Sequence, residues 1–160
     1  MKRFISVLLV ICSLALVLTA CSGGKKIDKL SEAMLSKQDS SIKMVTVKST
    51  DDNAAEAFKN TLDSFSIDKV DSFFIANAEN TREYSDEILV LHLKSAKSAD
   101  MAMAAVSKHF GYKSGSYMRV NPSQVPKLNN KSLFVFNNYV VLIISENSAE
   151  IEQAFYSIVK

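Results

Sequence analysis

The stretch that decides the fold is Asn137-Asn138-Tyr139-Val140-Val141-Leu142-Ile143-Ile144, two asparagines followed by an unbroken apolar run. Because the run has no polar residue at alternate positions, a strand over 139–144 must be covered on both faces. The asparagines follow another apolar run over 133–136, and asparagine tolerates a positive φ angle. Two apolar runs joined in this way predict a tight β-hairpin whose second strand is central in its sheet.

An earlier part of the chain predicts a second hairpin. Residues 70–76 and 87–93 are rich in branched and aromatic side chains, whereas the residues between them are mostly polar. We expect both strands to join one antiparallel sheet. Within 38–49, Lys43-Met44-Val45-Thr46-Val47 fits either a strand or an ordered crossing, and the sequence leaves this open.

Apolar residues at helical spacing predict four helices around these strands. Their apolar faces are, in chain order, Ile27, Leu30 and Met34; Ala55, Phe58, Leu62 and Phe65; Ala99, Met103, Val106 and Phe110; and Ile151, Ala154, Phe155 and Ile158. Thr50 or Asp51 caps the second helix, and Ser98 caps the third. Asn147 with Glu150 forms a start like a capping box for the last helix.

Glycine and proline mark two further segments. Gly111 weakens the third helix, so its continuation to Met118 is open. Pro122 and Pro126 are the only prolines of the chain, and they predict that 121–130 is the main surface loop.

The order of elements is helix, helix, strand, strand, helix, strand, strand, helix. It predicts an α+β domain in which two hairpins form a four-stranded antiparallel sheet with amphipathic helices packed on it. This layout, with Glu87-Ile88-Leu89-Val90 and the 138–144 stretch, resembles a family of small lipoproteins of Gram-positive bacteria catalogued as domain of unknown function 4358. The resemblance extends over nearly all of 21–160. Its motifs are structural, so it implies a fold but no activity and no site residues.

The N-terminal residues have the layout of a secretory signal, with Lys2 and Arg3 before an uncharged apolar run over 4–18. The run is shorter than the ~20 apolar residues that cross a membrane as a helix. It closes with Leu18-Thr19-Ala20-Cys21, which resembles the lipobox of bacterial lipoproteins. This resemblance implies cleavage between Ala20 and Cys21, diacylglycerol on the Cys21 sulfur, and a place on the outer face of the cell membrane.

The lipobox divides the chain into a signal peptide over 1–20, a lipidated tether over 21–26 and a single domain over 27–160. Gly23 and Gly24 predict a flexible tether. Lys25 and Lys26 follow directly, where anionic lipid headgroups attract them.

Charge and cysteine content exclude several kinds of site. The net charge of +2 comes from the signal, which leaves 17 basic residues against 17 acidic ones and gives no indication of nucleic-acid binding. Cys12 leaves with the signal and Cys21 carries lipid, so no disulfide forms within the chain. With two histidines and no spare cysteine, a Cys/His zinc site is excluded, and we expect no cofactor.

Motifs for catalysis are absent from the sequence. We interpret His92 as a strand residue whose ring is hydrogen-bonded or edge-exposed, and His109 as a solvated helix residue. The 111–115 segment lacks the glycine two residues before serine that a nucleophile elbow requires. The four glycines of the chain form neither a dinucleotide-binding nor a phosphate-binding loop.

The segment from Lys94 to Lys131 is strongly basic, and Asp100 is its only acid. One interpretation is a solvated face that acids elsewhere in the fold balance. The other is attraction to an anionic surface: headgroups, wall polymers or an acidic partner. The candidate contacts are Lys108, Lys113, Arg119 and Lys127.

We therefore expect a lipid-anchored, non-enzymatic domain that binds a partner or ligand at the cell envelope. An accessory subunit of a membrane complex and an enzyme acting on envelope substrates are the alternatives. A deep polar pocket around His92 would favour the enzyme, and a flat apolar patch the accessory subunit.

Overall fold

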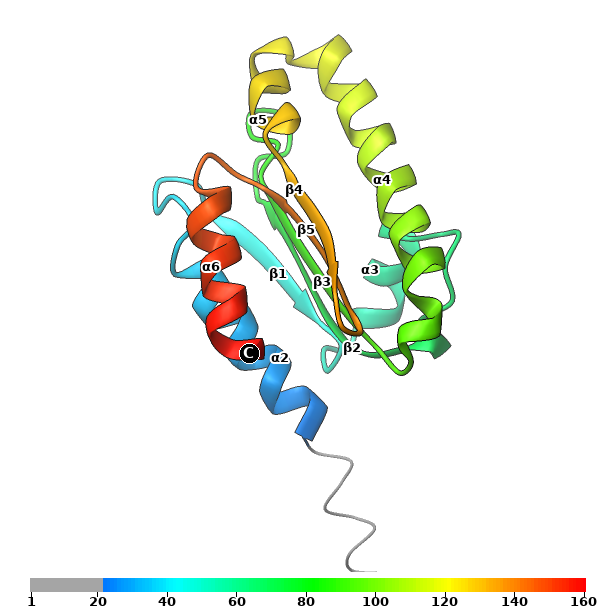
Figure 1. Cartoon of the computed structure of the whole chain (residues 1–160). Coiled ribbons are helices and arrows are strands. Elements are labelled where there is room, and N and C mark those ends of the chain that lie inside the picture. Colours follow the sequence, from blue (N-terminus) through cyan, green and yellow to red (C-terminus); the bar gives the residue numbers. More distant parts are fainter. Residues whose placement is uncertain (1–21) are drawn as a thin grey trace, which may run out of the picture.

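The computed structural model of the chain describes residues 22–160, which form a five-stranded antiparallel sheet between two layers of helices (Figure 1). The strand order is β1-β2-β3-β5-β4. The strands are β1 Met44–Lys48, β2 Val70–Ala78, β3 Glu87–Leu93, β4 Ser132–Phe136 and β5 Tyr139–Ile144. The predicted α+β class and its antiparallel sheet are confirmed.

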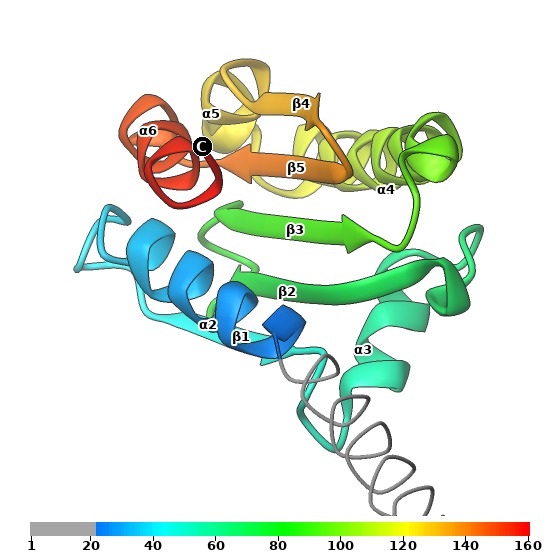
Figure 2. The same ribbon diagram turned by 60° about the horizontal axis from the view of Figure 1, so that its bottom comes forward.

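The helices lie on both faces of the sheet, as Figure 2 shows in a turned view. On one face lie α2 Ser22–Leu35 and α6 Ser148–Val159, and on the other lie α3 Ala54–Thr61 and α4 Ala99–Val120. Residues 22–160 also contain short helical segments: η1 Ile67–Lys69, η2 Ala96–Ser98, η3 Pro122–Gln124 and α5 Val125–Asn129.

Each central strand buries side chains on both faces, which produces two separate cores. Phe73, Leu91 and Leu142 pack with α3 and α4, on one face of the sheet. Their sequence neighbours point to the opposite face, because side chains alternate along a strand. Val90 and Val141 accordingly pack with α2 and α6.

The hairpin that decides the fold is confirmed. All residues of β5 are buried, and β5 lies between β3 and β4. Asn137 has a φ of 53°, and it is the only residue with positive φ among the described residues. A two-residue turn thus joins Phe136 to its partner Tyr139.

The predicted number of strands is wrong, because the sheet has a fifth strand. The segment that the sequence left open contains β1, which pairs antiparallel with β2, Met44 opposite Ala78. β1 is an edge strand and every residue in it is partly or fully exposed. An edge strand with two half-exposed faces lacks the alternation by which strands are recognised in sequence.

Helix α4 continues without a break through Gly111 and Gly115 to Val120, and Ser98 is its N-cap residue. Tertiary packing outweighs the low helix propensity of glycine, since α4 buries side chains from Ala102 to Tyr117. The prediction of a surface loop over 121–130 is wrong for this segment. It holds η3 and α5, and each has a proline near its start, at a position where helices accept one.

The other helices differ from expectation in detail. Residues 22–26, expected as a flexible tether, form the start of α2. Lys25 and Lys26 are good helix formers, so the helix begins before Ile27. In α3, Ala54 rather than Ala55 is buried. Asn147 is the N-cap of α6 without a side-chain capping bond. Across 22–160, helices of the length and apolar character needed to span a bilayer are absent.

Candidate functional site

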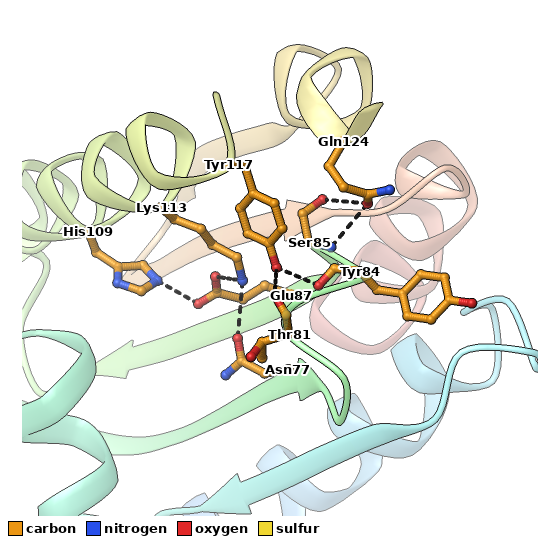
Figure 3. Close-up of polar contacts among 9 residues, drawn as sticks. All are labelled: Asn77, Thr81, Tyr84, Ser85, Glu87, His109, Lys113, Tyr117 and Gln124. Atoms are coloured by element: carbon orange, nitrogen blue, oxygen red, sulfur yellow. Dashed lines mark hydrogen bonds and ion pairs between the residues drawn. The ribbon is translucent and has the colours of Figure 1, made fainter. Parts of the chain in front are cut away.

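One face of α4 carries polar side chains toward the sheet (Figure 3). His109, Lys113 and Tyr117 are spaced four residues apart, so they lie above one another on the same side of the helix. They meet β3 where it begins and the loop 79–86 that leads into it. The cluster thus connects α4, the longest helix of residues 22–160, to the loop between β2 and β3.

Glu87 is the centre of the cluster and is fully buried. Its Oε2 accepts a hydrogen bond from Lys113 Nζ at 2.7 Å, and its Oε1 lies 2.8 Å from His109 Nε2. Lys113 Nζ also donates to the side-chain oxygen of Asn77 at 3.2 Å. Both carboxylate oxygens of this buried acid are therefore occupied by partners from α4.

The pKa of Glu87 reflects two opposed effects. Burial by itself raises the pKa of this carboxyl group, because a low dielectric disfavours its charged form. The charge of Lys113 and the hydrogen bond and charge of His109 outweigh burial and lower the pKa from 4.5 to about 2. Glu87 is therefore ionised at neutral pH, and α4 neutralises it.

Tyr117 holds the loop 79–86 against α4. Its hydroxyl lies within hydrogen-bond distance of the backbone oxygens of Thr81 and Tyr84, the latter at 2.6 Å. Burial raises the pKa of Tyr117, with smaller contributions from nearby acids, so the hydroxyl keeps its proton as a donor. One turn later Asn121 Nδ2 donates to the backbone oxygen of Glu83 at 3.1 Å. The loop thus gains fixed partners from α4 and from Asn121, the residue that follows it.

Asp86 forms a second buried pair beside Glu87. Its Oδ2 accepts from Lys127 Nζ of α5 at 2.7 Å, and its Oδ1 accepts from the Gln38 amide at 2.8 Å. Ser85 donates from its backbone and hydroxyl to Gln124 Oε1. We call this end of the molecule the apex; it comprises the loop 79–86, the last turn of α4, η3 and α5.

Of the four residues predicted to contact an anionic surface, only two are exposed. Lys113 is 12% exposed and pairs with Glu87, and Lys127 is buried against Asp86. These two lysines cannot reach a surface, so the prediction is wrong for them: local acids of the fold neutralise their charge. Lys108 pairs with Asp63 at 3.1 Å, and Arg119 is exposed. For Lys108 and Arg119 the surface contact stays a prediction.

The interpretation from the sequence is confirmed for His92 and wrong for His109. His92 is hydrogen-bonded, as interpreted from the sequence: its Nδ1 lies 2.9 Å from Asp71 Oδ2 and its Nε2 lies 2.8 Å from Asn138 Nδ2. The ring stacks on Tyr139 at 4.4 Å. The interpretation of His109 as solvated is wrong, because its ring binds Glu87. Sequence reasoning missed Glu87 itself, although the four-residue spacing along α4 indicated a common polar face.

The cluster reaches the surface at His109. This residue lines a hollow of about 190 Å³, together with Lys108, Asp63 and Tyr112. Within residues 22–160, groups of three or more histidine, cysteine or acidic residues that could hold a metal ion are absent. Ala20 and Cys21 lie outside the described residues, so the cleavage and lipidation inferred from the lipobox stay predictions.

Comparisons with protein-family models, curated proteins and solved structures find no match to this chain. The resemblance to domain of unknown function 4358 therefore stays a prediction.

Proposed function

We propose that the chain is an extracytoplasmic lipoprotein, held at the membrane by diacylglycerol on Cys21, and that its apex binds a protein partner in the cell envelope. The lipobox supports the anchor. The surface composition of the apex supports the partner, and it is the observation that carries the binding role.

Both arginines of residues 22–160, Arg82 and Arg119, are exposed at the apex. Near Arg119, Met118 and Val120 are 56% and 70% exposed, although both are large apolar residues. Arginine and methionine are enriched in protein interfaces, where charged residues are otherwise depleted. Lysine supplies all the other formal positive charge of residues 22–160, so the placement of both arginines at the apex favours recognition of a protein.

The buried network makes this surface rigid. Tyr117 and Asn121 fix the loop that carries Arg82, through its backbone oxygens. A binding surface held in place before the encounter loses less conformational entropy on association. The network therefore supports binding by a prearranged apex.

The same network supports a structural role, rather than a catalytic one, for its ionisable side chains. Glu87, His109 and Lys113 are types found in catalytic sites, but they are engaged with one another. A general base in catalysis must be within hydrogen-bond reach of the substrate's proton. Because both oxygens of Glu87 are occupied, the enzyme alternative gains no support from this cluster. If the partner is a membrane protein, the role is that of an accessory subunit.

Among the described residues, the start of α2 and the apex lie at opposite ends (Figure 1). β3 runs from Glu87 at the apex to Leu93, and its seven residues span roughly 20 Å at ~3.3 Å each. Lys26 near the start of α2 lies over the Tyr139 ring, and Tyr139 pairs with His92 near the far end of β3. A domain anchored before α2 presents its apex away from the anchor.

The test places a photo-crosslinking amino acid at Met118 of the full chain in its own cells. Met101 is the matched control, because it is a methionine on the same helix, 49% exposed, near the opposite end. We expect one discrete protein adduct from position 118, absent at 101 and weakened by Arg82→Ala with Arg119→Ala. The same adducts from both positions, or an adduct that the arginine changes leave undiminished, would overturn the binding role of the apex.

A further inference from the structure

The end of the molecule opposite the apex carries a group of lysines from two helices. Lys25, Lys26 and Lys29 lie on the first turns of α2 and are at least partly exposed, and with Ile158 of α6 they line one hollow. Lys160 follows the end of α6 and is also exposed. α2 and α6 pack together with opposite directions, which brings the start of one to the end of the other (Figures 1 and 2). We call Lys25, Lys26, Lys29 and Lys160 the basal lysines.

Aromatic rings lie beneath two of the basal lysines. Lys160 Nζ is 5.2 Å from the centre of the Tyr156 ring, and Lys26 Nζ is 5.6 Å from that of Tyr139. Tyr156 in turn packs against Phe136 of the hairpin. Tyrosine and lysine are the side chains that suit a membrane interface, with an apolar body and a polar end.

The charge of the basal lysines is not balanced by ion pairs. Among residues 22–160, none of the four lies within salt-bridge distance of an acid, whereas Asp28 on the same turns of α2 binds Lys48 at 2.9 Å. This contrasts with Lys113 of α4 and Lys127 of the apex, which pair with Glu87 and Asp86. The basal lysines therefore form a positive surface, although residues 22–160 as a whole have a formal net charge of zero.

This surface lies directly beside the proposed anchor. Lys25 and Lys26 follow Ser22 by about one helical turn, roughly 5 Å along the axis, and Lys29 by about two turns. Charges of exposed groups are screened over about 8 Å at physiological salt. At least two of the lysines are therefore within reach of headgroups around a lipid attached to the preceding residue.

We propose that the basal lysines dock the domain on anionic phospholipid headgroups of the membrane that holds the anchor, so that the domain stands upright with its apex outward. This inference rests on the proposed lipid anchor. Each basic residue near an anionic membrane surface favours the docked orientation by about fivefold. The anchor fixes where the chain is, and the basal lysines fix which way it faces.

The experiment measures orientation on the lipidated full chain, reconstituted into vesicles of phosphatidylcholine alone or mixed with phosphatidylglycerol. A fluorescent reporter is attached either at Ser157→Cys near the basal lysines or at Ser123→Cys at the apex. Nitroxide-labelled headgroups quench a reporter that lies near the membrane. We expect phosphatidylglycerol to increase quenching at position 157 several-fold, to leave position 123 unchanged, and to lose its effect as salt rises.

Two variants with equal loss of charge make the test specific. Changing the four basal lysines to Gln should abolish the effect of phosphatidylglycerol. The control changes four exposed basic residues toward the apex to Gln and should retain the effect: Lys37, Lys43, Arg82 and Arg119. Equal quenching at 157 in both vesicles, or equal loss in both variants, would overturn the docking inference.

A separate measurement distinguishes this failure from failure of the anchor. Fatty-acid label on the wild-type chain reports the anchor whatever its orientation. If the chain carries the fatty-acid label but phosphatidylglycerol does not change quenching at position 157, docking alone is overturned. Label absent would overturn the proposed anchor, and with it the docking that rests on that anchor.

Discussion

At the scale of single residues, Glu87 and Lys113 show how the fold accepts a buried charge. A carboxylate in the interior is tolerated only with a partner of opposite charge and with its hydrogen bonds satisfied. Lys113 supplies the charge from α4, and His109 supplies a further hydrogen bond. The pair therefore specifies how α4 sits on the sheet, and neither residue can be removed alone without cost.

We predict that Lys113→Met lowers the free energy of unfolding by about 3–5 kcal/mol, because it leaves Glu87 buried without its cation. The control is Lys108→Met on the same helix, where the exposed pair with Asp63 contributes about 0–1 kcal/mol. Urea denaturation measures both. Adding Glu87→Gln to Lys113→Met should recover part of the loss. Equal, small effects of the two lysine changes would contradict the account of the buried pair.

The lowered pKa of Glu87 predicts a pH dependence of stability. Its pKa is about 2 in the folded chain against 4.5 in the unfolded chain, so its contribution is present above pH 4.5 and is lost as the pH falls toward 2. The difference corresponds to about 3 kcal/mol. Urea denaturation across this pH range should show that the free energy of unfolding falls less steeply with decreasing pH for Glu87→Gln than for the wild type. Parallel curves would contradict the assignment.

At the scale of elements, β5 is the strand that holds both cores together. Val141 and Leu142 are both fully buried, one on each face of the sheet. We predict that Val141→Asp and Leu142→Asp each prevent folding, because an unpaired buried carboxylate costs several kcal/mol out of the ~5–15 kcal/mol of a whole domain. Val135→Asp on the edge strand β4, where Val135 is 41% exposed, is the control and should remain folded in thermal melts. Tolerance of either β5 change would show a solvated face.

Helix α4 carries two glycines that its packing does not require. Both Gly111 and Gly115 lie inside the helix, and a Cβ atom added at either would meet nothing within 4 Å beyond the helix's own backbone. We predict that Gly111→Ala and Gly115→Ala each raise the free energy of unfolding by about 0.5–1 kcal/mol, because glycine loses more backbone freedom on folding. Thermal melts measure this, and a lowered melting temperature would show a close neighbour at that position.

The elements that the sequence predicts well are those with a strong local pattern. The apolar run over 139–144 and the Asn137-Asn138 turn specify the β4–β5 hairpin without knowledge of its neighbours. β1 has no such pattern, because it is defined by its pairing with β2 and remains partly exposed. The polar cluster escapes sequence-based prediction for a related reason. In the sequence, the charge of Lys113 and Lys127 predicts that both side chains are exposed to solvent. In the fold they pair instead with Glu87 and Asp86, which are distant from them in sequence.

At the scale of the whole molecule, the two ends have different charge arrangements. At the apex Lys127 is held in a buried pair, as is Lys113 one turn before the apex on α4, whereas Arg82 and Arg119 are exposed. The opposite end exposes the basal lysines beside the start of α2. A sheet about 20 Å long separates the two ends. This polarity suits a domain that is fixed to a membrane at one end and binds a partner at the other.

The central claim, that Cys21 carries the lipid, is tested most directly by metabolic labelling with a fatty acid that can be detected on the purified chain. Two acyl chains on one residue suffice for a stable anchor, so a single substitution should abolish membrane attachment. We predict label on the wild-type chain and none on Cys21→Ala, which should be released from the membrane or accumulate unprocessed. Label retained on Cys21→Ala, or a wild-type chain without label, would contradict the account.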